Sequence, residues 1–275
     1  MIHIKQYVKQ LMKQIGDADV FGLSAQLAYF FLLSLFPFLL FLITLLGHFP
    51  IDEDMLMNFI ATYAPADITN LISTNISQII NSQNSGLLSI GIIGTLWSAS
   101  NGVNAITKSF NKAYEVEEDR SFLVSRLIAI ALTIAMVLVI IVALLLPIFG
   151  EKIGVYVFSI INMSDRFLEL WTMLRWVISS AVFFIVLIAL YSLAPNIRIK
   201  IKYVIWGAVF ATIGWQLVSL GFSYYVNTLG NYSATYGSLG TVIILMIWFY
   251  ISGIIINTGG VINALHLKRA RAKDD

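Results

Sequence analysis

Six long apolar segments constrain the fold of this chain more than any other feature of its sequence. Each is about as long as the ~20 residues that an α-helix needs to cross ~30 Å of hydrocarbon. Charged residues make up only 12% of the 275 residues, against about 25% in a typical soluble chain. We therefore expect an all-α polytopic membrane protein with six transmembrane helices. The expected spans cover residues 23–49, 87–106, 122–149, 170–193, 203–226 and 238–265.

The basic residues give these spans an orientation. If both termini are cytoplasmic, 14 of the 17 Lys and Arg residues fall on the cytoplasmic side, and only Lys152, Arg166 and Arg175 fall outside. Cytoplasmic loops of membrane proteins carry an excess of Lys and Arg. The split favours a multi-pass membrane protein with both termini in the cytoplasm.

Two amphipathic segments lie outside the expected spans. Residues 1–22 are basic and amphipathic, which favours a cytoplasmic N-terminal helix over a cleaved signal peptide. The loop 50–86 carries apolar residues at helical spacing from Ile68 to Ile79, which predicts an amphipathic extracytoplasmic helix between the first two spans. No linker or shift in composition divides the chain, so we expect one domain over residues 1–275.

Uncharged polar side chains interrupt several of the apolar spans. At about 100° per residue, those of the second span gather on one side, opposite Val103 and Ile106. We expect that polar side to face the bundle and the apolar side to face lipid. Similar stripes run along the first, fifth and sixth spans, and a proline bends the first. The residues expected to line a shared polar groove are Gln26, Tyr29, Ser34, Pro37, Ser98, Asn101, Asn104, Thr212, Gln216, Ser219, Ser223, Asn227, Thr241, Ser252 and Asn263.

Helix packing is an alternative explanation of these stripes, because small and hydroxylated residues are common between membrane helices. The fifth span helps to separate the two explanations. There Gly207, Gly214 and Gly221 form a small-residue seam on the face opposite Gln216. Close packing therefore has a face of its own, and a polar cavity is the simplest purpose for the second face.

The ionisable residues near the spans are few. Lys108, Arg126 and Arg175 lie near span ends, where we expect their long side chains to reach the membrane surface. No acidic residue lies deep in a span, which argues against a proton relay built on buried carboxylates. We expect the acidic run EVEEDR at residues 115–120 to be a solvated turn.

Catalytic and metal-binding motifs are missing from the sequence. The chain has no cysteine, which excludes disulfides and thiolate sites. His3, His48 and His266 form no metal-ligand pattern, and neither a GxSxG elbow nor a Walker motif is present. No Lys/Arg-rich face with interleaved aromatic residues indicates nucleic-acid binding. We expect a protein that is not an enzyme and that has no catalytic residues, cofactor, metal or nucleic-acid partner.

Four sets of motifs in the sequence are specific in combination: AQLAYFFLLSLFPFLL, LWSASNGVNAI, LYSLAPN with WGAVFA, and ATYGSLGTVIILMIWFYISGIIINTGGVINA. Together they resemble the YihY/BrkB family of multi-pass proteins of the bacterial inner (cytoplasmic) membrane. The resemblance covers nearly the whole chain and implies six membrane helices. It also implies a link, for some members, to serum resistance or envelope lipid export, while the family's older label of ribonuclease BN is generally regarded as mistaken. Val261 stands where the family often has an acidic residue, so coupling to protons or cations through that acid is not expected here.

These observations favour a transporter or flippase that moves a lipid, an amphiphile or another polar small molecule through the polar groove. A non-catalytic membrane scaffold or complex subunit is the alternative, and a ribonuclease is the least favoured function. The expected partners are membrane lipid and an unidentified small-molecule or lipid substrate, with a homo-oligomer as an open alternative.

Overall fold

Helices are the only regular secondary structure in the described part of the chain, which confirms the all-α fold class. The computed structural model describes residues 2–46, 85–139, 166–229 and 238–274. The helices within these ranges are α1 (Ile2–Asp17), α2 (Val20–Leu46), α6 (Ser85–Tyr114), a helix over Phe122–Val139, α8 (Arg166–Leu193), α9 (Ile201–Leu229) and α11 (Ser238–Asp274).

Three of these helices contain stretches that are long and apolar enough to cross a membrane: Phe122–Val139, Ile201–Tyr225 and Val242–Ala272. A fourth candidate is the pair Gln6–Asp17 and Val20–Leu35, whose axes meet at a bend of 51°. The expected count of six spans stays a prediction. The amphipathic segment expected around residues 68–79 lies outside the described residues.

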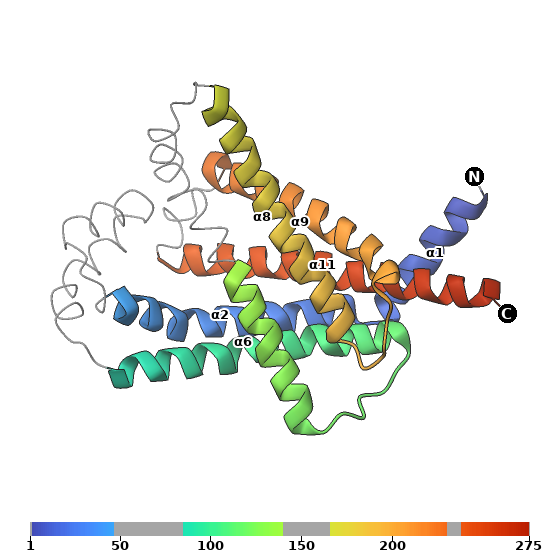
Figure 1. Cartoon of the computed structure of the whole chain (residues 1–275), viewed down its shortest axis with the longest axis horizontal. Coiled ribbons are helices and arrows are strands. Elements are labelled where there is room, and N and C mark those ends of the chain that lie inside the picture. Colours follow the sequence, from blue (N-terminus) through green and yellow to red (C-terminus); the bar gives the residue numbers. More distant parts are fainter. Residues whose placement is uncertain (1, 47–84, 140–165, 230–237, 275) are drawn as a thin grey trace.

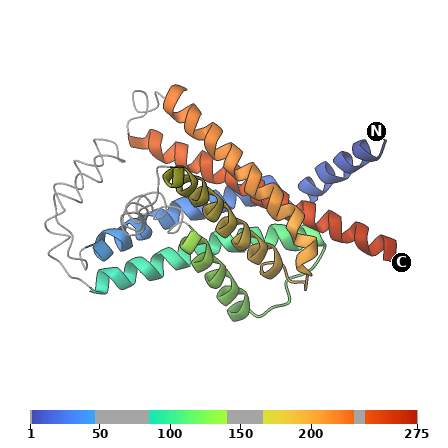
Figure 2. The same cartoon turned by 45° about the horizontal axis from the view of Figure 1, so that its top comes forward.

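α11 is the central helix of the bundle, because it packs against α2, α6 and α9 and also touches α1. Figure 1 shows α2 and α6 side by side, with α8 and α9 crossing them at an angle. In both views α1 and the last turns of α11 lie at the same end of the bundle (Figures 1 and 2). We call this the terminal end. The other end, where α2 stops and α6 begins, is the distal end.

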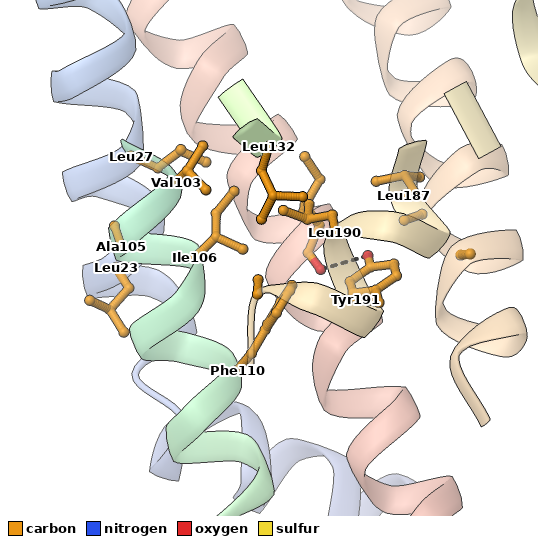
Figure 3. Close-up of a cluster of buried hydrophobic side chains, with 14 of the residues drawn as sticks. Leu23, Leu27, Val103, Ala105, Ile106, Phe110, Leu132, Leu187, Leu190 and Tyr191 are labelled. Atoms are coloured by element: carbon orange, nitrogen blue, oxygen red, sulfur yellow. Dashed lines mark hydrogen bonds between the residues drawn. The ribbon is translucent and has the colours of Figure 1, made fainter. Parts of the chain in front are cut away.

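The main core lies between α2, α6, α8, α9 and α11 (Figure 3). Val103, Ile106 and Phe110 of α6 are fully buried in it, together with Leu27 of α2 and Tyr191 of α8. Lipid tails are as apolar as these side chains, so the core is held mainly by close packing and hydrogen bonds between helices rather than by exclusion of water.

Close contact between helices at the terminal end depends on glycine. Gly207 of α9 faces Gly259 of α11, and a Cβ on either residue would overlap the carbonyl oxygen of the other. Gly260 leaves room on another side of α11 for the ring of Phe110 from α6. Tyr191 of α8 donates a hydrogen bond of 2.8 Å to a backbone oxygen of α11 (Figure 3). Four helices therefore meet within one short stretch of α11.

α2 also approaches its neighbours over glycines. Pro37, in the interior of α2, packs on Gly94 of α6, where an added Cβ would lie 3.1 Å from the proline ring. A Cβ at Gly102 of α6 would lie 2.8 Å from the ring of Phe31. The mid-helix proline is thus accommodated by a residue without a side chain on the facing helix.

A polar network at the terminal end joins the loop after α6 to the loop before α9. Arg120 donates to both carboxylate oxygens of Glu118, at 2.6 Å each, and to the backbone oxygen of Ala194 at 2.8 Å. Asn111 donates to Glu118 at 2.9 Å and accepts from the backbone N–H of Asn196 at 2.7 Å. We call Asn111, Glu118, Arg120 and Asn196 the terminal network. The acidic run that we expected to be a solvated turn is exposed, but these bonds fix its conformation.

The N-terminal segment is helical, as expected, and forms a second small core with α11. Tyr7, Leu11 and Ile15 of α1 pack on a cluster that contains Val261 and Leu265. Their spacing of four residues places them on one face of α1. Since Val261 is fully buried in this cluster, the residue at the family's acidic position is a packing residue in this chain.

Candidate functional site

The polar side of α6 meets the helix Phe122–Val139 through Arg126. This arginine donates to Asn101 Oδ1 at 2.7 Å and to the backbone oxygen of Trp97 at 3.1 Å. Its guanidinium also lies over the Trp97 ring, 3.8 Å from the centroid. Arg126 is only 8% exposed, and its Nε has no hydrogen-bond partner in the part of the chain that the structure describes. No acidic side chain of the described ranges forms an ion pair with it.

Two asparagines supply further hydrogen-bonding groups on the same side of α6. Because a guanidinium only donates, Asn101 must present its oxygen to Arg126, and its Nδ2 faces elsewhere. Neither that Nδ2 nor the amide of Asn104 bonds to a described residue, and both side chains are half-buried. Lys108, which is exposed, follows Asn104 by one turn. We call Asn101, Asn104, Lys108 and Arg126 the α6 polar site.

The apolar side of α6 lies in the core, so the expectation that it faces lipid is wrong. Val103 and Ile106 are fully buried and Ala99 is 7% exposed, whereas Ser98, on the polar side, is half-buried. The physical reason is that α6 packs along α2 by fitting apolar side chains around glycines such as Gly102. In a bilayer an apolar face can pack equally well on lipid or on protein, so polarity alone does not choose between them.

The polar arc of α9 is divided between two neighbouring helices. Gln216 donates to Ser180 of α8 at 2.6 Å, and Ser219 accepts a long 3.4 Å bond from Trp248 of α11. Thr212 is buried and donates to the backbone oxygen of Ala208 in its own helix, at 2.8 Å. Of the remaining two predicted residues of this arc, Ser223 is exposed, and the side chain of Asn227 is outside the described set.

The glycine seam on the opposite face of α9 packs against α11 over part of its length. Gly207 touches Gly259 and Asn263, and a Cβ on Gly214 would lie 3.2 Å from Ile255. Gly221, near the distal end, has open space beside it. The expected packing face is therefore confirmed for the first two glycines, and the third lies beyond the contact.

The predicted residues of α11 and α2 occupy different environments. Asn263 is fully buried and accepts from the backbone N–H of Gly207 at 2.7 Å, while Ser252 is buried with no partner for its hydroxyl. Ser34 is buried and donates to the backbone of its own helix, whereas Gln26 and Tyr29 are exposed. Pro37 is half-buried against α6, and the side chain of Thr241 is not described. A groove shared by these residues stays a prediction.

Two cavities bear on function. An apolar groove of about 640 Å³ lies between α9 and α11 in the distal half. A charged cavity of about 400 Å³ lies between α1, α6 and α11 at the terminal end. Neither is lined by a predicted groove residue whose side chain the structure describes. The apolar groove is lined by residues that include Leu217, Val218 and Phe222 of α9 and Ile244, Ile247 and Ile251 of α11.

Two of the buried polar residues outside the predicted set donate side-chain hydrogen bonds to another membrane helix. They are Arg126 and Asn257; Asn257 is fully buried and donates to Ser24 of α2 at 2.8 Å. No polar stripe predicted from the sequence includes either, because Asn257 lies off the line of the other polar residues of its helix and Arg126 lies near the end of an apolar span. An isolated polar residue among apolar ones is itself a signal, since it must find a partner on a neighbouring helix. Over the described ranges, no three His, Cys, Asp or Glu side chains are grouped to hold a metal ion.

Known proteins resemble this chain over nearly its whole length. The family model described as Virulence factor BrkB matches residues 11–275. The ribonuclease-like protein YfkH of Bacillus subtilis is 52% identical over 98% of this chain and 98% of its own. A UPF0761 membrane protein of Alteromonas mediterranea is 26% identical over 90% of this chain and 83% of its own. One from Aliivibrio fischeri is 28% identical over 92% and 81%. No solved structure matches.

Proposed function

Because the chain belongs to the BrkB family of membrane proteins, we propose that it is a transporter or flippase that moves a lipid or another amphiphile across the bilayer. One observation carries this proposal. The polar side of α6 keeps hydrogen-bonding groups that have no partner among the described residues, and the adjoining helix Phe122–Val139 exposes apolar side chains.

Such a combination suits a molecule with a polar head and apolar chains. A polar group without a hydrogen-bond partner costs several kcal/mol in hydrocarbon, and about 1–3 kcal/mol when it is buried in a protein. Water or a ligand is therefore expected to bond to Asn104 and to the free donors of Asn101 and Arg126. Phe122, Leu123 and Leu127 are each more than two-thirds exposed and could contact chains of the same molecule. The apolar groove between α9 and α11 offers a second surface for chains, in the distal half.

The topology that we propose for this function has six spans in the inner membrane, with the terminal end in the cytoplasm. It is supported by the strong excess of Lys and Arg in the segments assigned to that side. Since the chain has no cysteine, single cysteines report sidedness without background. In intact cells, an impermeant maleimide should label Ser73→Cys and leave Ala272→Cys unlabelled until the membrane is opened. Labelling of both before opening would contradict this orientation.

Lipid movement tests the function directly. The purified full chain is reconstituted in vesicles that carry a fluorescent phospholipid, and an impermeant reductant added outside reports how fast the inner-leaflet label becomes accessible. We expect faster loss of the protected signal than in empty vesicles, and slower loss for Asn104→Ala than for wild type. Gly16→Ala is a matched control, because an added methyl there meets open space. Rates equal to those of empty vesicles would contradict the proposal.

A non-catalytic scaffold or complex subunit is the second candidate, and one observation favours it. Several predicted groove residues already bond to residues of neighbouring helices: Gln216 to Ser180, Ser219 to Trp248 and Asn263 to Gly207. A scaffold needs no open path, so it predicts a stoichiometric partner in detergent extracts together with no lipid movement in vesicles. We propose no enzymatic activity. Metal-dependent RNA cleavage that is lost on a single point mutation would overturn that part.

A further inference from the structure

We propose that the α6 polar site binds the phosphate group of an anionic membrane lipid. This inference rests on the proposed function, because it names the class of substrate that the lipid-moving protein would recognise. It starts from Arg126, a cation that is nine-tenths buried and has no carboxylate partner in the described ranges.

A buried cation without a counter-ion is costly. Isolating a charge from water costs several kcal/mol unless an opposite charge and hydrogen bonds compensate it. At Arg126 the compensation from the protein is incomplete: one amide oxygen, one backbone oxygen and the face of Trp97. Its Nε proton has no acceptor within the described ranges. A phosphate oxygen supplies both the missing acceptor and the missing negative charge, and guanidinium pairs with phosphate in strong charge-assisted hydrogen bonds.

The neighbouring groups are donors, as an anion requires. Arg126 fixes the Asn101 amide with its oxygen inward, which leaves the Asn101 Nδ2 protons to donate outward. Asn104 adds a second amide without a protein partner, and the ammonium of Lys108 lies one turn further along the same side. In the described part of the site no carboxylate competes for these donors. The set matches a phosphate with several oxygens better than it matches a neutral sugar or an amine.

The position of Arg126 selects a lipid over other carriers of phosphate. Arg126 lies four residues after the start of its helix, which is about 6 Å along the axis. In the proposed topology that depth is the headgroup–glycerol level of the cytoplasmic leaflet. Phe122, Leu123 and Leu127, all within four residues of Arg126 on the same helix, expose apolar side chains beside it. A free phosphate ion would use the donors and leave this apolar surface without a partner.

Lipid retention by the purified full chain tests the site. Native mass spectrometry of the protein in detergent would follow titrations with phosphatidylglycerol, with phosphatidylcholine and with inorganic phosphate. We expect phosphatidylglycerol to bind more tightly than either of the others, and Asn104→Ala to weaken it about tenfold, the loss of one charge-assisted hydrogen bond. Arg126→Gln should abolish the preference for the anionic lipid. Lys112→Gln is the control, because it also removes one positive charge but lies one turn beyond Lys108 on α6. It should leave the preference for the anionic lipid unchanged.

The variants keep the test decisive if one of them fails to fold. Asn104 makes no hydrogen bond to a described residue, so Asn104→Ala should unfold at the wild-type temperature even if Arg126→Gln does not. Equal binding of phosphatidylglycerol and phosphatidylcholine, or unchanged binding in Asn104→Ala, would overturn the site. If inorganic phosphate bound as tightly as phosphatidylglycerol, the site would be one for free phosphate, and the proposal of a lipid ligand would be wrong. Lipid movement without selective binding overturns only this inference, and selective binding without movement overturns only the transport function.

Discussion

The two ends of the bundle are built differently although the same helices run through both. At the terminal end α9 touches α11 backbone to backbone at Gly207 and Gly259, and the terminal network ties the adjoining loops together. In the distal half, Gly221 of the same seam has open space beside it, and an apolar groove separates α9 from α11. Leu217 and Leu220 there are each more than 60% exposed.

This difference indicates where the bundle can change shape. Backbone contacts over glycine and a charged network leave little room for one helix to slide on another, so the terminal end would act as the fixed part of any movement. In the distal half, the described polar contact between α9 and α11 is the long 3.4 Å bond between Ser219 and Trp248. Motions of packed helices about a fixed contact are a common form of domain opening. Four predictions test the contrast, from the largest effect to the smallest.

A methyl group added to the glycine seam should lower stability strongly at the terminal end and hardly at all in the distal half. Gly207→Ala places a Cβ on the Gly259 carbonyl and the Asn263 side chain, which must push α9 off α11. We expect the free energy of unfolding in detergent to fall by about 3 kcal/mol, at the upper end for overpacking. Gly221→Ala meets nothing within 4 Å and should be neutral or slightly stabilising. Equal losses at both positions would remove the contrast between the two ends.

Removing the central cation of the terminal network should be the next largest effect. Arg120→Ala removes the two 2.6 Å hydrogen bonds that Glu118 accepts from Arg120, and it removes the bond to the backbone oxygen of Ala194. We expect a loss of about 2 kcal/mol, the range of hydrogen bonds to charged groups after allowance for partial exposure. Thermal unfolding in detergent measures it. Arg198→Ala, an exposed basic residue of the next loop, is the matched control and should change little; a similar loss there would mean that net charge is the cause.

The polar bonds of α11 should differ in value between the two halves. Ser24→Ala removes the acceptor for the fully buried Asn257, whose bond is 2.8 Å, and should cost about 1 kcal/mol. Ser219→Ala removes only the 3.4 Å bond from Trp248 and should cost less than about half as much. A double-mutant cycle of Ser24→Ala with Asn257→Ala would assign the coupling. A larger loss at Ser219 would place the stronger polar contact in the distal half.

Acid should weaken the terminal network selectively. Hydrogen bonds from Arg120 hold the pKa of Glu118 below its ordinary value of 4.5. Because the folded pKa is the lower one, the stabilisation is complete above the unfolded value and disappears as pH falls through the folded value. Wild type should therefore be more stable than Glu118→Gln at neutral pH, and the two should converge as pH falls well below 4.5. Glu117→Gln, whose carboxylate makes no described bond, should track wild type across the range.

The positions of the helices in the sequence could be predicted from local features. Which side of each helix faces its neighbours could not. The length of an apolar run sets a membrane helix, and α8, for example, ends at Leu193, where its expected span ends. A helix does not have to end where its apolar residues end. α6 therefore extends to Tyr114 and α11 to Asp274, whereas the sequence predicts that these spans end at residues 106 and 265. Which side of α6 is buried depends on how its glycines fit α2, and no pattern within one helix contains that information.

The candidate site shows the same limit at single residues. Asn101 and Asn104 could be selected because they recur on one side of a helix. The contact between Arg126 and Asn101 could not be predicted, because the two residues lie on different helices and the sequence does not show how the loop after α6 places the second helix against the first. Its position near a span end also fits a side chain that reaches the membrane surface, whereas the structure turns it toward Asn101 and Trp97.

The central place of α11 has a consequence for how the molecule is made. It is the last of the described helices to leave the ribosome, yet α2, α6 and α9 all rest on it. Until it inserts, the earlier helices reside in the bilayer without the partner that fits their glycines, and the fully buried Asn257 and Asn263 have not yet arrived. Assembly of this bundle is therefore completed after translation, and quality control in the cell would first meet it as a set of loosely associated helices.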